Sequence, residues 1–384
     1  MKKLLLLLAG LFIIACGSMD VESFAYDDEE VSTQDNPVVD EDSLSAKVDE
    51  LISETNIGAD EGPGGAVMVI QDGNILHQKG YGLADIDTGK PITPETIFHL
   101  GSVSKQFTAL GVMILEQQGE LDYDASIGEY FPELAWMGEE VTIRRLLQHT
   151  SGIPDYDENE DLYDALMAIS EQPSNADVIT ALSEQTELLY EPGSEFLYSN
   201  TGYDVLGALI ESISGQSYPD FMEENIFSKL GMQDTFAVPD PARLKGPNVS
   251  VSYMDEGGEP QAYEPDPLDD INGSGSTYSN LTDFFLYDQA LYGDEILSQD
   301  ALEEAFIPAT LDNGKSTDYG FAWDVTDYQG ETYYGHSGAW LGFSSYYVRF
   351  PERQLSIVLL LNFDYLQPYD DETLVFKIAD LYLE

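Results

Sequence analysis

The chain of 384 residues has few basic residues and a single cysteine. Fifteen lysines and arginines stand against 72 aspartates and glutamates, which gives a formal net charge of −57. Such a field repels nucleic-acid phosphates and anionic membrane surfaces, so we expect neither as a partner of the folded domain. The lone Cys16 excludes a disulfide within the chain. Histidine, cysteine and carboxylate residues show no metal-site spacing, so we expect no metal and no other cofactor.

The excess of acidic residues has two explanations, which the sequence leaves open. A densely charged, solvated surface keeps a protein soluble. The alternative is adaptation to concentrated salt, because the Debye length falls to about 3 Å at 1 M ionic strength and self-repulsion is then screened. On the second hypothesis, added salt stabilises the folded domain.

The N-terminus has the pattern of an export signal. Lysines at positions 2 and 3 precede an apolar stretch at 4–14, which is too short to span a bilayer as a mature helix. The run Ile-Ile-Ala-Cys that ends at Cys16 is similar to the bacterial lipobox, whose cysteine is acylated and becomes the new N-terminus. We expect residues 1–15 to be a cleaved signal peptide and Cys16 to be lipidated. The chain would then be an exported lipoprotein of the bacterial cell envelope, in the outer membrane, held to the lipid bilayer through Cys16 only. An ordinary signal peptide with an incidental cysteine is the alternative.

Composition and periodicity predict one folded domain after an acidic tether. Residues 16–43 contain no lysine or arginine and predict a disordered spacer. An Asp-Gly pair at 72–73 between two apolar runs predicts a β-hairpin. Helical spacing begins at Ser102, and His149 ends one helical pattern, where a structural role suits it. Strand patterns return near the C-terminus, before a final helix at about 371–381. These strand patterns cover residues 320–323, 332–334, 344–350 and 355–361.

This order of elements predicts an α+β fold for residues 44–384. We expect an antiparallel sheet flanked by helices, with a helical lobe at about 97–310 inserted into it. The cleft between the sheet and the lobe is the default location of a functional site.

Ser102 and Lys105 form the first candidate catalytic pair. Residues three apart at a helix start share a face, so the hydroxyl and the amine can meet within hydrogen-bond distance. The amide of Ser102 would lie in the first turn, where unpaired N–H groups and the helix dipole favour an oxyanion. The alternative is that Ser102 only caps the helix.

Two later motifs supply further candidates. Tyr198 and Asn200 precede a helical pattern, where a tyrosinate could take the serine proton and the amide could hold the acylamino side of a substrate. A His-Ser-Gly run ends a strand pattern, where a glycine lets a substrate backbone approach the strand edge. We predict His336 as a catalytic residue and Ser337 and Gly338 as substrate-binding residues. Structural roles for Tyr198, Asn200 and His336 are the alternative.

Taken together, the motifs resemble one known superfamily. They are similar to the signatures of the serine β-lactamases and D-alanyl-D-alanine carboxypeptidases, from about residue 44 to the C-terminus. The similarity is greatest to the branch with class C β-lactamases, related carboxypeptidases, D-aminopeptidases and β-lactamase-like esterases. It implies a serine hydrolase that works through an acyl-enzyme. The runs that carry it are FHLGSVSKQFTA at 98–109, HTSGIP at 149–154, YSNTGY at 198–203, YGFAW at 319–323 and HSG at 336–338.

The resemblance implies a role for each candidate. Ser102 would be the nucleophile, Lys105 the amine that helps to deprotonate it, and Tyr198 the residue that relays the proton to the leaving group. Asn200 would hold the acyl side of the substrate. The amides of Ser102 and Ala339 would form the oxyanion hole. Because the net charge of −57 favours protonated Lys105, local desolvation must outweigh that field if the amine is to act as a base.

Position 336 departs from the β-lactamases, most of which have lysine there. Histidine is largely neutral at pH 7 and offers no permanent charge to a substrate carboxylate. We therefore expect a hydrolase of carboxypeptidase, esterase or aminopeptidase type. We also expect the protein to be a monomer. Its substrate would be a small molecule or peptide, namely an ester, an amide or a D-amino-acid peptide. A true β-lactamase and a non-catalytic penicillin-binding or sensor module are the alternatives.

Overall fold

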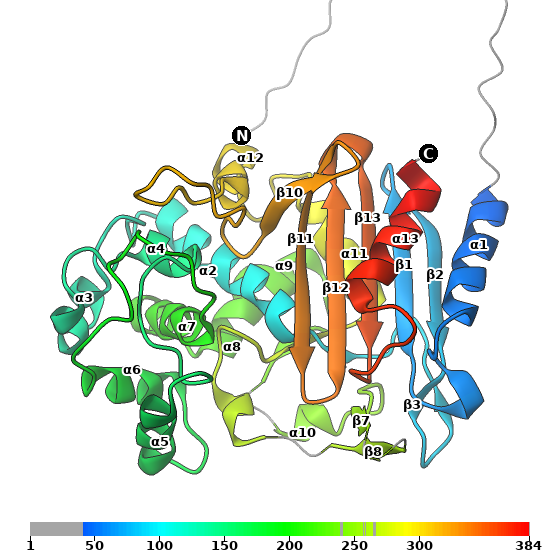
Figure 1. The fold of residues 1–384 in the computed structure, drawn as a ribbon, viewed down its shortest axis with the longest axis horizontal. Helices are drawn as coiled ribbons and strands as arrows, with labels where there is room; N and C mark the ends of the chain where they lie inside the picture. The colour runs from blue at the N-terminus through cyan, green and yellow to red at the C-terminus, as the bar shows by residue number, and fades with distance from the viewer. Residues whose placement is uncertain (1–40, 239–240, 256, 258, 264–265, 384) are drawn as a thin grey trace, which may run out of the picture. The chain divides into compact units, whose positions relative to one another are not determined.

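A six-stranded antiparallel sheet lies at the centre of the fold, as Figure 1 shows. The computed structural model describes residues 41–238, 241–255, 257, 259–263 and 266–383. The expected signal peptide, Cys16 and the tether as far as residue 40 lie outside these residues. The strand order is β10-β11-β12-β13-β1-β2. The strands are β1 Gly65–Gln71, β2 Asn74–Tyr81, β10 Asp324–Tyr328, β11 Glu331–Trp340, β12 Phe343–Phe350 and β13 Leu355–Leu361.

Strands from both ends of the domain pair within this sheet, which confirms the α+β prediction. β1 pairs antiparallel with β13, so that Gly65 lies opposite Leu361. β1 also pairs with β2 through the predicted hairpin. Its two turn residues have positive φ angles, 50° at Asp72 and 72° at Gly73. A two-residue turn with both residues in this region matches the right-handed twist of the flanking strands.

Helices cover both faces of the sheet. On one face lie α1 (Glu41–Ser53) and α13 (Asp371–Leu383), and α11 (Leu281–Ala290) lies on the other (Figure 1). Alternate residues of β1 point to opposite cores: Val67 packs towards the first face and Met68 towards the second. This two-sided burial explains why β13 is apolar at every position except Ser356 and does not alternate between apolar and polar residues.

A mainly helical lobe is inserted between β2 and β10. It also contains short strands that the sequence patterns did not predict, among them the three-stranded sheet β5-β9-β6. Within the described ranges the longest helix, α7, has 15 residues, and no helix has the length and apolar character needed to cross a bilayer. The helices are α2 Lys105–Gln117, α3 Ile127–Tyr130, α4 Ile143–Leu147, α5 Glu160–Ile169, α6 Asn175–Ser183, α7 Asn200–Ser214, α8 Tyr218–Met222, α9 Ser228–Leu230, α10 Pro241–Leu244 and α12 Gln299–Leu302. The short strands are β3 Leu83–Asp85, β4 Lys90–Pro91, β5 Phe98–His99, β6 Phe236–Ala237, β7 Tyr253–Asp255, β8 Pro260–Ala262 and β9 Thr277–Ser279.

Three local predictions differ from the structure. Residues 320–323 form a buried bend rather than a strand, and β10 begins only at Asp324. Ala322 has a φ of 64° and Phe321 is fully buried, so the apolar run reflects a packed loop and not a pleated strand. The His-Ser-Gly run lies inside β11, which continues to Trp340. The folded domain begins with α1 at Glu41, three residues before the predicted boundary at residue 44.

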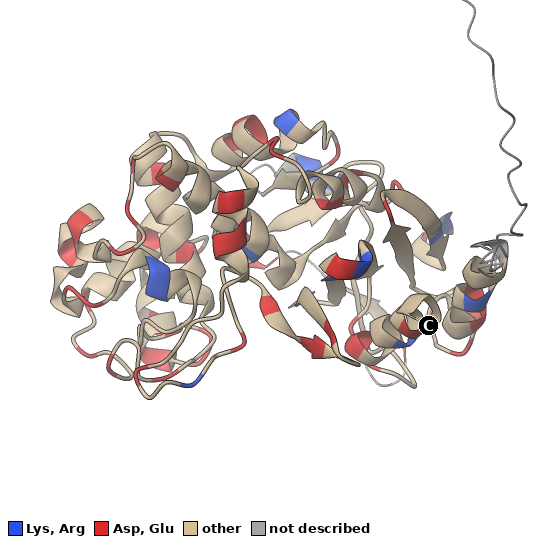
Figure 2. Ribbon diagram, turned by 90° about the horizontal axis from the view of Figure 1, so that it is seen from above, with Lys and Arg blue, Asp and Glu red and all other residues tan. Residues whose placement is uncertain are grey.

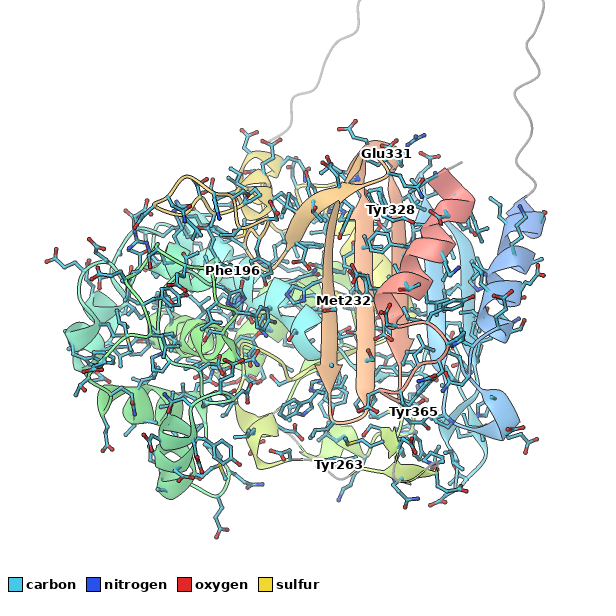
Figure 3. All side chains as sticks on the ribbon, in the orientation of Figure 1. Phe196, Met232, Tyr263, Tyr328, Glu331 and Tyr365 are labelled. Carbon is cyan, nitrogen blue, oxygen red and sulfur yellow. The ribbon has the colours of Figure 1, made fainter. Side chains whose placement is uncertain are left out.

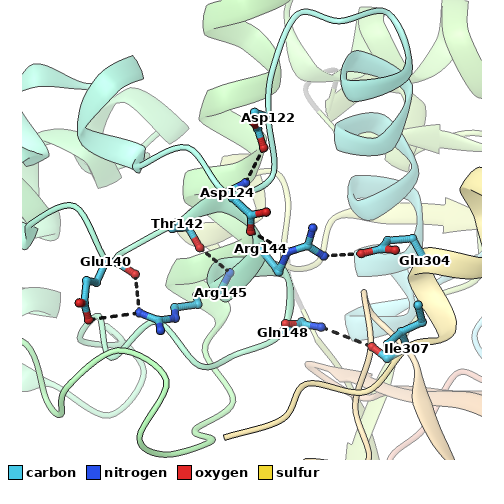
Figure 4. Close-up of polar contacts among 9 residues, drawn as sticks. All are labelled: Asp122, Asp124, Glu140, Thr142, Arg144, Arg145, Gln148, Glu304 and Ile307. Carbon is cyan, nitrogen blue, oxygen red and sulfur yellow. Dashed lines mark hydrogen bonds and ion pairs between the residues drawn. The ribbon is translucent and has the colours of Figure 1, made fainter. Parts of the chain in front are cut away.

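Arg144 on α4 joins two segments of the helical lobe. Its guanidinium group forms ion pairs with Asp124, at 2.8 Å, and with Glu304 on the segment after α12 (Figure 4). The neighbouring Arg145 donates to the carbonyl oxygen of Glu140 at 2.9 Å. Figure 2 shows that acidic residues greatly outnumber basic ones on the ribbon. Fifteen bases cannot pair one to one with 72 acids, so most carboxylates lack a lysine or arginine partner of their own.

Candidate active site

Ser102 and Lys105 meet at the start of α2. The chain forms a 3₁₀ turn over Gly101–Ser104 and then continues as an α-helix from Lys105. The two side chains therefore project from one face, with Lys105 Nζ 3.1 Å from Ser102 Oγ. The predicted pair lies within hydrogen-bond distance, in a geometry suited to proton transfer.

Lys105 is fully buried and surrounded by acceptors. Besides Ser102, its Nζ lies 2.6 Å from Asn200 Oδ1 and 2.7 Å from the carbonyl oxygen of Ser274. Burial lowers the pKa of Lys105 from 10.5 to about 7, although the carboxylates of Asp204, Asp155 and Asp157 favour the charged form. A large fraction of the amine is thus neutral near pH 7 and can accept the proton of Ser102.

Tyr198 lies in the loop before α7, beside the lysine. Lys105 Nζ is 4.8 Å from the centroid of the Tyr198 ring. The hydroxyl oxygen is buried and lies beside the hydroxyl of Ser102. Burial raises the pKa of Tyr198, and the proximity of the Ser102 hydroxyl only partly opposes this. The resting side chain is therefore a neutral phenol rather than the tyrosinate that the sequence suggested, and it suits donation of a proton to a leaving group.

Two glycines bring β11 against the serine turn. A Cβ atom on Gly101, whose φ is 51°, would lie 2.5 Å from the amide nitrogen of Ala339. A Cβ atom on Gly338 would lie 2.1 Å from the carbonyl oxygen of Leu100 and 3.0 Å from the amide nitrogen of Ser102. Only glycine permits these approaches. They place the amides of Ser102 and Ala339 side by side, the arrangement required to hold an oxyanion.

Gly338 has a structural role that the sequence did not suggest, because it admits the protein's own loop. Its predicted role in admitting a substrate backbone stays a prediction. The neighbouring strand adds a second link, because Ser345 Oγ on β12 donates to the carbonyl oxygen of Leu100 at 2.7 Å. Ser345 lies directly opposite Gly338 in the β11–β12 register. The sheet and the serine turn are thus held together from two strands.

His336 takes part in a chain of hydrogen bonds between the helical lobe and β11. The amide of Ser199 donates to His149 Nδ1 at 3.1 Å, so His149 carries its proton on Nε2, 3.3 Å from the Tyr319 hydroxyl. The Tyr319 hydroxyl lies 2.9 Å from His336 Nε2, and His336 Nδ1 lies 2.5 Å from the carbonyl oxygen of Ser337. All four hydrogen bonds are satisfied when each group donates to the next one in this order. The Tyr319 hydroxyl then donates to His336 Nε2, and His336 Nδ1 donates to the carbonyl oxygen of Ser337.

His149 and His336, the two histidines in this series of hydrogen bonds, are neutral at pH 7. Burial, assisted by the charge of Lys105, lowers the pKa of His336 to about 4 and the pKa of His149 well below 6.5. Both ring nitrogens of His336 are already engaged within the protein. His336 lines the site, but it offers no positive charge to a substrate carboxylate. Its contacts suit the positioning of β11 against the helical lobe.

Ser102 lies between two hollows of different character. On one side is a small cavity of about 50 Å³ that Asn200, Tyr156 and Trp340 line. On the other is a cavity of about 570 Å³ that Tyr198, Ser337 and Ala339 line together with Phe196. Phe196 is labelled in Figure 3, between the helical lobe and β11. A substrate carbonyl at Ser102 would thus direct its two halves towards Asn200 and towards Tyr198.

Sequence reasoning missed the support beneath Lys105. Asp204 is fully buried and accepts hydrogen bonds from the amide of Ser274, at 2.9 Å, and from the hydroxyl of Tyr156, at 2.8 Å. It thereby holds the Ser274 carbonyl that contacts the lysine. An available signal was the spacing: Asn200 and Asp204 are four apart on a helical pattern and share a face. The hydrogen bonds that Tyr319 makes with both histidines were missed as well. Tyr319 lies in the YGFAW run at 319–323, for which the motif alone predicted no role.

The arrangement of Ser102, a buried lysine of depressed pKa and two neighbouring amides is the one that a serine hydrolase with a lysine base requires. The comparisons with known proteins agree with this class. The family model for Beta-lactamase matches residues 49–379. Penicillin-binding protein 4* of Bacillus subtilis (strain 168) is 33% identical over 317 residues, which are 78% of this chain and 68% of that protein.

Two further matches extend the comparison. Protein flp of Staphylococcus aureus (strain MW2) is 26% identical over 306 residues, and the match spans 78% of this chain but only 59% of the length of Flp. The octameric penicillin-binding protein homologue from Pyrococcus abyssi superposes with a TM-score of 0.75 at 26% identity, over 90% of this chain and 77% of that one. The chain belongs to the β-lactamase family, within a group of serine hydrolases that share the penicillin-binding-protein fold.

Proposed function

We propose that this protein hydrolyses esters, amides or D-amino-acid peptides through an acyl-enzyme on Ser102. The observation that carries the proposal is the 3.1 Å contact of Ser102 Oγ with the buried amine of Lys105, whose pKa burial lowers to about 7. A base of this pKa is matched to the operating pH, so little energy is lost in reaching its reactive form.

The contacts support a sequence of proton transfers. Neutral Lys105 takes the proton of Ser102 as Oγ attacks the substrate carbonyl, and the amides of Ser102 and Ala339 hold the oxyanion. Collapse of this intermediate expels the leaving group, which receives a proton from the phenol of Tyr198, and Lys105 returns its proton to the phenol. Water then attacks the acyl-enzyme with the same groups in reverse. Asn200, on the other side of Ser102, holds the acyl half.

The neutral state of His336 supports substrates other than strongly anionic ones. A β-lactam or a peptide with a free C-terminus presents a carboxylate, and burial keeps the pKa of His336 at about 4, so the residue gives that group no cationic partner. We therefore place esters, amides and neutral or cationic peptides ahead of β-lactams. A β-lactamase or a penicillin-binding module remains the second candidate, because relatives bear the name penicillin-binding protein.

We also propose that the mature protein is a monomer and an exported lipoprotein of the outer membrane, anchored through an acylated Cys16. The lipobox-like run before Cys16 supports the anchor. The octameric state printed for the Pyrococcus abyssi homologue belongs to that protein. Globomycin treatment, a Cys16→Ala variant and membrane fractionation test the anchor, and light scattering of the domain from residue 41 tests the monomer.

The experiment for the catalytic proposal combines active-site labelling with a substrate panel. Wild-type protein should react covalently with a fluorophosphonate probe and turn over some of the following: short-chain aryl esters, D-amino-acid amides, D-Ala-D-Ala peptides and nitrocefin. The Ser102→Ala variant should lose both activities, whereas Ser104→Ala, two residues along the same turn, should keep the label. Labelling that persists in Ser102→Ala would reject the nucleophile. Nitrocefin as the best substrate would reverse the order of the two candidates.

A further inference from the structure

The cavity on the Asn200 side of Ser102 is much smaller than the cavity on the Tyr198 side. The first has a volume of about 50 Å³ and the second a volume of about 570 Å³. Because a single water needs roughly 10–15 Å³ of such space, the smaller cavity holds about three to five groups of that size. In the proposed mechanism Asn200 holds the acyl half of the substrate. The volume of this cavity therefore limits the acyl chain that can be buried there.

Trp340 forms one wall of the small cavity. It is the last residue of β11, and it follows Ala339, whose amide lies beside the amide of Ser102. The Trp340 ring is inclined by 24° to the ring of His99, and their centroids are 6.4 Å apart. His99 lines the same cavity and is buried, and burial lowers its pKa to about 3, so its ring is neutral at pH 7. Two uncharged rings therefore bound this part of the cavity.

A hydrogen bond to Asp269 fixes the orientation of the indole ring. Trp340 Nε1 donates to Asp269 Oδ1 at 2.5 Å, and the amide of Asp266 donates to Asp269 Oδ2 at 2.9 Å. Asp269 is buried, with 8% of the residue exposed, and both of its carboxylate oxygens are satisfied within the protein. Burial raises the pKa of Asp269 to about 6, so the carboxylate is mainly ionised at pH 7. A charged acceptor makes the hydrogen bond from the indole stronger than one between neutral groups.

A local sequence pattern determines the position of Asp269. Residues Pro267–Asp270 form a 3₁₀ turn that Asp266 caps, and the Asp269 side chain accepts the return hydrogen bond from the Asp266 amide. This capping box holds the carboxylate in place independently of β11. The same segment brings Leu268 and Ile271 into the lining of the small cavity. The hydrogen bond from the indole therefore joins two walls of the cavity, one from β11 and one from this turn.

We propose that Trp340, held by Asp269, is a specificity-determining residue that limits the acyl half of the substrate to a short group. An acyl chain of up to about three carbons beyond the carbonyl carbon fits the small cavity, whereas a longer chain meets the indole ring. The larger cavity at Tyr198 leaves room for a bulkier leaving group. The inference rests on the proposed hydrolase function and narrows its substrate class to esters, amides or peptides with a small acyl half.

The test uses p-nitrophenyl esters, which share one leaving group and differ in the length of the acyl chain. For the wild-type enzyme we expect kcat/KM to be at least about tenfold lower for the octanoate than for the butyrate, because one methylene group that a pocket excludes costs about 10–200-fold. Trp340→Ala should raise the octanoate-to-butyrate ratio of kcat/KM by about tenfold or more. Trp340→Phe keeps most of the ring and should raise the ratio less. A wild-type enzyme that prefers the octanoate would overturn the inference, as would an unchanged ratio in a folded Trp340→Ala protein.

Two variants in the 3₁₀ turn test Asp269 as a positioning residue. Asp269→Ala leaves the indole N–H without its acceptor, so the octanoate-to-butyrate ratio should rise as it does in Trp340→Ala. Asp270→Ala removes a carboxylate one position further along the same turn, outside the cavity lining, and should leave the ratio unchanged. An equal change in both variants would reject the positioning role of Asp269. The chain-length profile of the wild-type enzyme tests the cavity even where a variant does not fold.

A binding measurement distinguishes failure of this inference from failure of the hydrolase proposal. Ser102→Ala protein labelled with 5-fluorotryptophan has three fluorine resonances, one for each tryptophan, and Trp340→Phe in that background assigns the resonance of Trp340. Methyl butyrate should shift this resonance, and methyl octanoate should shift it much less. If this pattern appears but the wild-type protein hydrolyses no ester, the acyl cavity stands and the catalytic proposal fails. If esters are hydrolysed regardless of chain length and both methyl esters shift the resonance equally, the catalytic proposal stands and the inference fails.

Discussion

Gly338→Ala should disable catalysis while leaving the fold intact. The new methyl group would lie 2.1 Å from the carbonyl oxygen of Leu100 and 2.5 Å from Ser345 Oγ. Ordinary contacts begin near 3.4 Å, so β11 must move away from the serine turn by roughly 1.3 Å. Such a shift separates the amide of Ala339 from that of Ser102. Loss of one oxyanion-hole donor costs about 10²–10³ in kcat, and a displacement of about 1 Å has a similar cost.

The assay for Gly338→Ala is single-turnover acylation followed by steady-state hydrolysis of the best ester. We expect the acylation rate to fall by about 10²–10³ while KM changes much less, because the oxyanion forms only in the reaction. Gly335→Ala, on the same strand as Gly338, is the control, since the nearest atom to a Cβ there is the carbonyl oxygen of Tyr347 on β12, at 3.2 Å. Both variants should melt cooperatively. Wild-type acylation by a folded Gly338→Ala protein would refute the close approach of β11 to Ser102.

Three further predictions concern the charged groups. The kcat/KM of the wild-type enzyme should rise with pH through about 7, because Lys105 must lose its proton to act. Asp204→Asn removes a carboxylate that favours the ammonium form of Lys105. In a pH–rate profile of this variant, the rise in kcat/KM should therefore occur at lower pH. Arg144→Gln should lower stability by about 1 kcal/mol, because the ion pairs with Asp124 and Glu304 are partly exposed, and calorimetry should show a melting temperature about 1–2 °C lower. If the acidity reflects salt adaptation, the melting temperature should rise between dilute buffer and molar sodium chloride, and an unchanged temperature would reject that hypothesis.

Local patterns in the sequence were sufficient for the sheet hairpin and for the catalytic pair. The Asp72–Gly73 turn and the Ser102–Lys105 spacing depend on residues that are neighbours along the chain, so periodicity and turn chemistry define them. The run at 320–323 misled because a buried bend and a buried strand are equally apolar. A buried bend and a buried strand differ in the segments that pack against them, and the sequence of the run itself does not reveal those segments.

The support of the site could not be predicted, because distant segments supply it. The carbonyl oxygen that contacts Lys105 belongs to Ser274, 169 positions further along the chain, and Asp204 orients it from α7. The neutral state of His336 depends on Tyr319 and on burial, neither of which the His-Ser-Gly run reveals. Spacing identified which residues gather at the site, whereas their protonation states follow from the packed environment.

Lys105 shows how a protein with a net charge of −57 can keep a basic amine. Carboxylates raise a lysine pKa by attraction, yet most of the chain's acids act through water, where about 4 Å of separation yields only about 1 kcal/mol and salt screens the rest. Desolvation acts at the amine itself, and complete burial of Lys105 outweighs even the nearby Asp204, Asp155 and Asp157. Burial also raises the pKa of Asp204 to about 6, so its attraction weakens as the pH falls. The reactivity of the lysine therefore depends on the dryness of its site. Substitutions that admit water beside Lys105 should raise its pKa and reduce activity at pH 7 more than exposed charge substitutions do.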